Sequence, residues 1–202
     1  MGKKIAETLP KYLTRKEIEA MIEECGNIRD ELILLFMYNI GARVSELINF
    51  RIEDIDFENN SVSIFRGKGA KDRTVNISKD FAQLLRAFVR RKDKGTLFIS
   101  NHGKPFTPRA IQKKIKSIAM SAGLAYIDKI TPHSLRHTHA VHALQSGVNI
   151  VSIKKHLGHK NLKTTMVYTE ISDEIVKKDF EDHKPFKLKK EYDQKSLKGY
   201  KS

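Results

Sequence analysis

The chain has 202 residues, which is enough for one domain with a substantial apolar core. Its one cysteine, Cys25, excludes an internal disulfide framework and a multi-cysteine zinc site, and no apolar run approaches the roughly 20 residues of a membrane span, so we expect a cytoplasmic protein without a membrane partner. The net charge is +14, of which residues 184–202 carry +5, and this excess favours nucleic acid as the partner over an acidic protein or a merely soluble basic surface.

The first predicted helix begins after Thr14, and Glu17 follows three residues later. This pair is typical of a capping box, in which each side chain bonds the other residue's backbone amide. The apolar face of this helix comprises Ile18, Met21 and Ile22. A second helix is predicted over residues 28–40, where apolar side chains recur at helical spacing, and Gly41 is placed to end it.

Between residues 52 and 77 the spacing of the apolar side chains changes to every second residue, which is typical of strands. Strands are expected around Ile55, Val62 and Val75, with turns at residues 59–60 and 67–69. The segment therefore predicts a small antiparallel sheet of three strands.

Capping residues mark most of the elements beyond the sheet. Ser78 can cap a helix that reaches about residue 91, and the pairs Thr107-Pro108 and Thr131-Pro132 each supply a cap followed by a first-turn proline. The remaining predicted elements are an extended piece at 97–99, a helix at 150–157 that ends at Gly158, and a helix at 173–183.

The expected fold class is α+β, mainly α-helical, with one three-stranded antiparallel sheet. Residues 1–183 are expected to form one domain, and residues 184–202 a disordered lysine-rich tail. The sequence contains no Walker-type phosphate loop and no dinucleotide fingerprint, which argues against a nucleotide-driven motor.

Several side chains are suited to binding a phosphate. His133 and Arg136 lie three residues apart near the start of a predicted helix, where the helix dipole is positive. Lys68 lies at a hairpin tip between two glycines, which lets another backbone come close. His159 follows a helix end, and Tyr168 lies nine residues later. Taken singly, none of these signals is specific.

Together, these residues resemble the tyrosine recombinase family, in particular archaeal and bacterial Xer-type recombinases and phage-type integrases. The similarity covers about residues 9–183 and includes five motifs in the family's order: Gly41-Ala42-Arg43-Val44-Ser45-Glu46-Leu47, Arg66-Gly67-Lys68-Gly69-Ala70-Lys71-Asp72-Arg73, His133-Ser134-Leu135-Arg136-His137, Leu157-Gly158-His159, and Tyr168. The resemblance implies the catalytic-domain fold of DNA breaking and rejoining enzymes, and site-specific DNA recombination as the function.

The resemblance also implies a role for each matching residue. Tyr168 is the expected nucleophile, which forms a 3′-phosphotyrosine link to DNA without ATP, metal or other cofactor. Arg43 and Arg136 are expected to clamp the non-bridging phosphate oxygens, since guanidinium groups bind phosphate bidentately. Lys68 is the expected general acid for the leaving 5′ oxygen.

Further roles follow in the same way. His133 is the expected proton acceptor near the tyrosine, and His159 the expected oxyanion donor or a supporting residue behind it. Glu46 is expected to orient the cations of the site. Independently of the resemblance, His137 is expected to be a buried structural partner and not a metal ligand. Two basic residues of the hairpin are expected to contact DNA: Lys71 and Arg73.

Each assignment has an alternative reading. Arg43 and Glu46 could form an ordinary helical ion pair, and Tyr168 could be a core tyrosine. His133 and His137 have metal-ligand spacing, but no carboxylate or cysteine neighbours them on the helix, so we expect no metal site. Topoisomerase-like relaxation and binding of DNA without cleavage are the rival functions.

The family implies two further expectations about organisation. Members usually carry an additional N-terminal core-binding domain before the segment that begins here near Leu9, and that domain is expected to be absent from this chain. Four protomers are expected to assemble on two double-stranded DNA sites, with residues 173–183 packing on a neighbour, whereas the chain can be a monomer when free of DNA.

Overall fold

The computed structural model describes residues 12–65, 73–90 and 92–158. The helices in these residues are α1 (Arg15–Glu23), α2 (Ile28–Ile40), α3 (Val44–Ile48), α4 (Lys79–Val89), α5 (Pro108–Ser121), α6 (Pro132–Gln145) and α7 (Ile150–Leu157), with short 3-10 turns η1 (Ile52–Asp54) and η2 (Ile127–Lys129). The strands are β1 (Ile55–Asp56), β2 (Ser61–Ile64) and β3 (Arg73–Asn76). The expected fold class is thus confirmed; the helix predicted at 173–183 lies outside the described residues.

The predicted helix caps are confirmed. At the start of α1 the Thr14 amide donates to Glu17 Oε2 at 2.7 Å, and the Glu17 amide donates to Thr14 Oγ1 at 3.3 Å, so both halves of the capping box are present. The side chains of Ser78, Thr107 and Thr131 each accept from a backbone amide in the first turn of α4, α5 and α6. These helices therefore begin where local chemistry satisfies their first amides.

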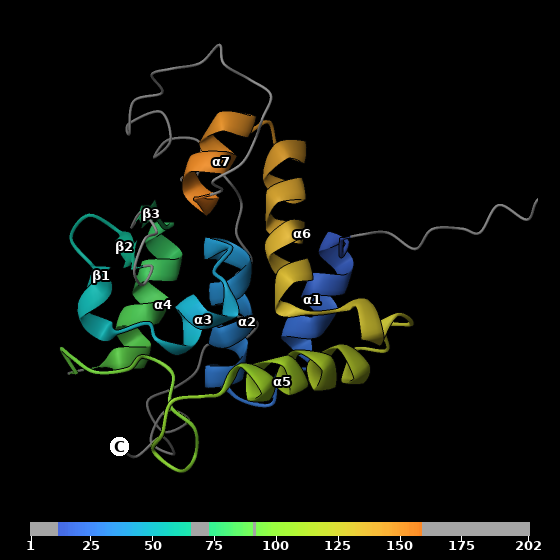
Figure 1. Cartoon of the computed structure of the whole chain (residues 1–202), viewed down its shortest axis with the longest axis horizontal. Coiled ribbons are helices and arrows are strands. Elements are labelled where there is room, and N and C mark those ends of the chain that lie inside the picture. The colour runs from blue at the N-terminus through green and yellow to red at the C-terminus, as the bar shows by residue number, and fades with distance from the viewer. Residues whose placement is uncertain (1–11, 66–72, 91, 159–202) are drawn as a thin grey trace, which may run out of the picture.

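Helix α2 forms the centre of the molecule (Figure 1). All of its residues are buried, because α1, α3 and α6 pack around it. The sequence indicated one apolar face on this helix, and the structure covers the polar face as well. None of the helices in the described part of the chain is long and apolar enough to cross a membrane.

The three strands form one antiparallel sheet in the order β1-β2-β3, as predicted. Val62 pairs with Ile55 on one side and with Val75 on the other, and all three side chains are buried. Ile64 pairs with Arg73, so the first residue of β3 lies beside the end of β2.

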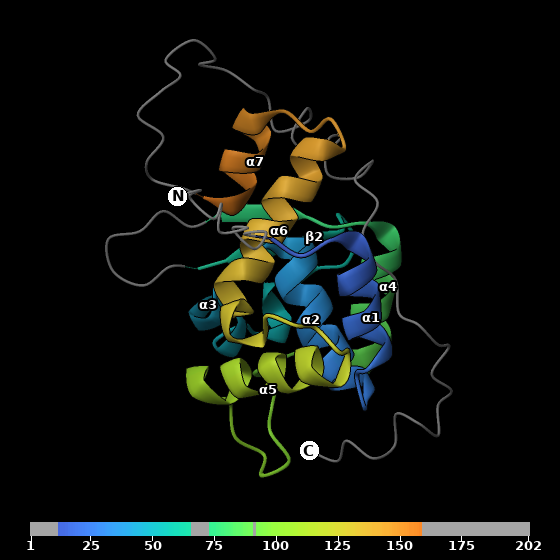
Figure 2. The same cartoon turned by 90° about the vertical axis from the view of Figure 1, so that its right-hand side faces the viewer.

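Two helices enclose the ends of this core. In both views α5 runs across one end of the molecule (Figures 1 and 2), where it contacts α1, α3 and α6. Helix α7 lies at the opposite end and contacts both α6 and β3. A small apolar cluster of Ala143, Val148, Ile153 and Leu157 holds α7 against α6. This packing brings the C-terminus of α7 to the start of β3.

Candidate active site

The site begins at the junction of α2 and α3. Gly41 ends α2 in the left-handed conformation, with φ of 62°, and a Cβ at this position would overlap the Leu157 side chain. Only glycine meets both conditions without strain. Arg43 follows as the N-cap of α3, and its amide donates to Glu46 Oε2 at 2.8 Å.

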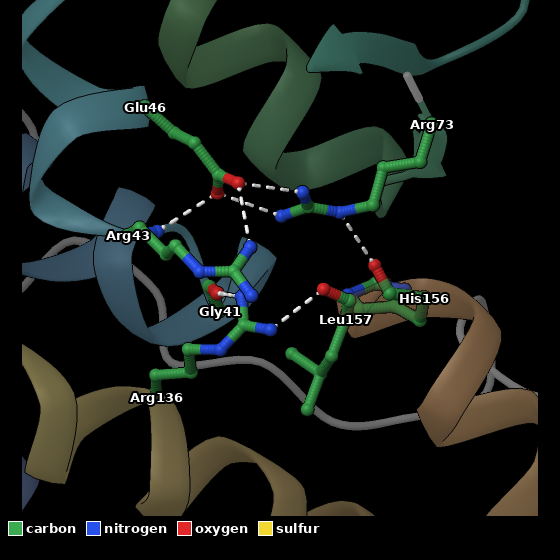
Figure 3. A network of polar contacts seen from close by, with 7 residues as sticks. All are labelled: Gly41, Arg43, Glu46, Arg73, Arg136, His156 and Leu157. Carbon is green, nitrogen blue, oxygen red and sulfur yellow. Dashed lines mark hydrogen bonds and ion pairs between the residues drawn. The ribbon is translucent and has the colours of Figure 1, made fainter. Parts of the chain in front are cut away.

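The carboxylate of Glu46 is shared by two arginines. Arg43 Nη1 lies 3.0 Å from Glu46 Oε1, and Arg73 donates through Nη1 and Nη2 to the two carboxylate oxygens at 2.8 and 2.9 Å (Figure 3). Burial raises the pKa of Glu46, but the hydrogen bonds and charge of Arg73, with those of Arg43, outweigh burial and lower this pKa to about 2. Glu46 is therefore ionised at neutral pH.

The contacts of Arg73 differ from the expected contact with DNA. Its side chain is 7% exposed, and besides its bidentate pair with Glu46 it donates through Nε to the His156 carbonyl at 2.8 Å. The reason is the packing of α7 against β3, which covers the first residue of that strand. Arg73 is thus committed to intramolecular contacts in this structure.

Arg136 projects from α6 and is 3% exposed. Its Nη2 donates to the Leu157 carbonyl at 2.6 Å, and its Nη1 donates to the carbonyl of Gly41 (Figure 3). Two neutral backbone carbonyls therefore orient the Arg136 side chain. The side chain of Arg43 is 41% exposed, and one of its terminal nitrogens pairs with Glu46.

The histidines of α6 fall on two faces. His133 and His137 are exposed, one turn apart. The prediction that His137 is buried is wrong, because the buried stripe of α6 runs through Leu135, Arg136, His139 and His142. The aromatic partner of His137 is Tyr12, with ring centroids 6.5 Å apart.

Three buried histidines were not singled out from the sequence. His139 stacks on His156 with ring centroids 5.0 Å apart, which joins α6 to α7. His142 Nδ1 shares a hydrogen bond of 2.7 Å with the hydroxyl of Tyr38 on α2. The spacing of His139 and His142 from Leu135 is helical, so this stripe was the available signal.

Four predicted site residues lie outside the described residues: Lys68, Lys71, His159 and Tyr168. Three of them follow described elements in the chain: Lys68 and Lys71 belong to residues 66–72, which connect β2 to β3, and His159 follows Gly158, which ends α7. Within the described ranges, no group of three or more His, Cys, Asp or Glu side chains could hold a metal ion.

The described part of the site can bind an anion. Two arginines from different elements, Arg43 and Arg136, belong to one network of contacts, and Glu46 is the carboxylate that pairs with Arg43. Guanidinium groups that are fixed in advance stabilise the charge of a phosphoryl group in its transition state.

Comparison with known proteins is consistent with such chemistry. A model of the phage integrase family matches residues 11–174. Tyrosine recombinase XerA of Pyrococcus furiosus is 39% identical over 181 residues, which cover 86% of this chain and 62% of the relative. Tyrosine recombinase XerA of Pyrococcus horikoshii is 38% identical over 186 residues, which cover 90% of this chain and 64% of the relative. The chain thus spans less than two thirds of the length of these relatives.

Two solved structures of Xer recombinases are also similar to this chain. The crystal structure of XerA recombinase superposes with a TM-score of 0.69 at 31% identity, covering 88% of this chain and 66% of that chain. XerH site-specific recombinase, solved as a pre-cleavage complex bound to difH substrate, has a TM-score of 0.63 at 27% identity and covers 76% of this chain and 48% of that chain.

Proposed function

The chain belongs to the phage integrase family, and from that premise we propose that it cuts and rejoins double-stranded DNA at specific sites, as the catalytic part of a tyrosine recombinase. The observation that carries the proposal is the network that links Arg43 and Arg136 through Gly41, Glu46, Arg73 and the end of α7. Two cations held by the fold can together stabilise the negative charge of one phosphodiester in its transition state.

The proposed reaction is a phosphoryl transfer to Tyr168. The phenol oxygen attacks the scissile phosphorus, a bond forms between tyrosine and the 3′ phosphate, and the bond to the 5′ oxygen breaks. His133 accepts the phenol proton, and Lys68 gives a proton to the departing 5′ oxygen. One phosphoester bond replaces another, so the reverse step rejoins a strand without an energy source.

Arg43, Arg136 and His159 are proposed to bind the non-bridging oxygens during this step. Their contribution is electrostatic, because negative charge builds on these oxygens as the transition state forms. Glu46 has a supporting role: it binds Nη1 of Arg43, whose side chain is 41% exposed.

Double-stranded DNA is the proposed partner. The net charge of +14 supports it, since lysine and arginine side chains that neutralise phosphates release condensed counterions. The XerH relative was solved bound to its difH substrate, which is consistent with a DNA partner here. We further propose four protomers on two DNA sites, with residues 173–183 as the segment that contacts a neighbour.

The test uses a suicide duplex with a nick close to the cleavage site. After cleavage, the short fragment that carries the free 5′ hydroxyl diffuses away, so the strand cannot be rejoined. Wild type should form a denaturation-resistant adduct through the 3′ phosphate, and Tyr168→Phe should form none. Tyr192→Phe is the matched control and should behave as wild type. An adduct that survives Tyr168→Phe would contradict the nucleophile assignment, and DNA binding without any adduct in wild type would favour a non-cutting protein.

A two-site substrate then identifies the reaction. Exchange of strands between two duplexes is expected for a recombinase. Relaxation of supercoiled DNA without exchange would instead indicate that the hydroxyl attacks its own strand again, as in topoisomerase-like chemistry.

A further inference from the structure

Two consecutive carbonyls at the end of α7 bind two different arginines. The His156 carbonyl accepts from Arg73 Nε at 2.8 Å, and the Leu157 carbonyl accepts from Arg136 Nη2 at 2.6 Å. Carbonyls in the last turn of a helix lack partners within the helix and carry the negative end of its dipole. The end of α7 is therefore held between two guanidinium groups.

These bonds are part of a closed ring of contacts (Figure 3). Arg73 joins the end of α7 to Glu46, and Glu46 joins Arg73 to Arg43. On the other side Arg136 joins the end of α7 to the Gly41 carbonyl, two residues before Arg43. The ring runs through β3, α7, α6 and the α2–α3 junction, which are distant in the sequence.

We propose that Arg73 is a positioning residue for strand cleavage: it sets the placement of Arg43 and Arg136 relative to each other without touching DNA. This inference rests on the proposed function. Its basis is that Arg73 uses three directed N–H groups, two on Glu46 and one on the His156 carbonyl, and that its side chain is 7% exposed.

Loss of Arg73 would loosen both arginines of the clamp. Glu46 would keep Arg43 as a partner but would lose its bidentate bonds, so the carboxylate that anchors Arg43 could shift. The His156 carbonyl at the end of α7 would lose its bond to Arg73 Nε. The end of α7 would then be free to shift, and the neighbouring Leu157 carbonyl, which orients Arg136, would shift with it. A displacement of about 1 Å in a positioned group can lower a reaction rate about 100-fold.

The ordinary alternative is a buried ion pair that only stabilises the fold. Breaking such a pair costs stability, because one charge is left buried without compensation. Stability alone predicts no change in the cleavage rate of the folded protein. A positioning role therefore predicts a lower rate constant for folded, DNA-saturated variant protein, whereas a purely stabilising ion pair predicts an unchanged one.

The experiment compares Arg73→Lys and Arg73→Met with wild type and with Arg86→Met. Arg86 is an exposed arginine on α4 that stacks on the side chain of Phe57. Its substitution removes the same charge at a position outside the network of Arg43, Arg73 and Arg136. For each protein we would measure the thermal midpoint, the Kd for an uncleaved duplex, and the first-order rate of adduct formation on the nicked duplex at saturation.

Arg73→Met is expected to form adduct about 100-fold more slowly than wild type, while its Kd changes no more than that of Arg86→Met. Arg73→Lys keeps a positive charge beside Glu46, but one ammonium cannot reach both carboxylate oxygens and the His156 carbonyl. It should therefore bind DNA as wild type does and cleave about 10-fold more slowly. If Arg73→Met does not fold, this lysine variant decides the question.

The pH profile supplies a second readout. Without Arg73 the burial of Glu46 opposes its ionisation with less compensation, so the carboxyl should protonate at a higher pH. The rate of Arg73→Met should then begin to fall at a higher pH than the rate of wild type as the solution is acidified. A change in stability alone produces no such trend in the folded protein.

Adduct formation by both Arg73 variants at the wild-type rate would overturn the inference, as would equal losses in rate and DNA affinity. Failure of wild type to form an adduct, or an adduct in Tyr168→Phe, would instead refute the proposed function. The two failures are thus distinguishable.

Discussion

The guanidinium of Arg136 lies 2.6 Å from the carbonyl oxygen of Leu157, and this bond joins α6 to the last residue of α7. Arg136 is buried, and its second terminal nitrogen donates to the Gly41 carbonyl. Backbone groups therefore fix the direction of this side chain before any phosphate binds, which is the preorganisation that electrostatic catalysis requires.

We predict that Arg136→Ala lowers the cleavage rate by about 100- to 1000-fold, because the proposed donor to the transition-state phosphate is lost. DNA affinity should change much less, since the net charge of +14 supplies many other cations for phosphate contacts. Single-turnover cleavage and equilibrium binding on the same duplex measure the two effects, with Arg86→Ala as the control. Equal losses in rate and affinity would count against the clamp role.

Gly41→Ala should destabilise the fold by about 1–3 kcal/mol, because alanine is strained at φ of 62° and its Cβ would overlap the Leu157 side chain. Urea unfolding measures the loss. Gly26→Ala is the matched control: a Cβ added at Gly26 would have no atom within 4 Å, so this variant should be as stable as wild type or slightly more so. Similar stabilities for the two variants would refute the packing argument.

Glu46→Gln should lower the free energy of unfolding at neutral pH by on the order of 3 kcal/mol, because Arg73 loses its buried partner. The folded pKa of Glu46 is lowered from 4.5 to about 2, so the ionised group stabilises the fold above pH 4.5. That contribution is lost as pH falls towards 2. The difference between wild type and variant should therefore shrink over this interval.

Urea unfolding at several pH values tests this expectation. Glu58→Gln, on an exposed side chain, is the control and should track wild type throughout. A wild-type advantage over Glu46→Gln that stays constant down to pH 2 would show that the charge of Glu46 is not the source of its stabilisation.

Tyr38→Phe should cost about 1–3 kcal/mol of stability, because it leaves His142 Nδ1 buried without the hydroxyl at 2.7 Å. Burial raises the pKa of Tyr38 to about 12, so the hydroxyl stays neutral in the folded protein. The free energy of unfolding in urea measures the cost. Tyr12→Phe is the control, since its hydroxyl has a longer, exposed contact of 3.4 Å with Gln145. Equal effects of the two substitutions would contradict the prediction.

Much of the fold could be predicted from short-range patterns. Thr14 with Glu17 and the pairs Thr107-Pro108 and Thr131-Pro132 located the starts of α1, α5 and α6 correctly. Caps and turns depend on residues within four positions of one another, so the sequence contains the whole interaction. The alternation around Val62 and Val75 located the strands in the same way.

Burial was predicted less well. Helix α2 is buried on every side, although the sequence indicated one apolar face, and His137 is exposed, against expectation. No pattern in the sequence indicated that Arg73 is covered. The physical reason is that a side chain's exposure depends on which other elements pack over it. Arg73 is covered because α7, more than 70 residues later in the chain, lies against β3.

The order of residues by itself determined where most elements begin and end, and it was enough to recognise the family of this chain, because both depend on side chains at fixed spacing. Only the tertiary structure decided that Arg43 and Arg136 belong to one network and that Arg73 connects them. Those contacts join residues up to 95 positions apart, and their energies depend on burial and on direction in space, which no local pattern specifies.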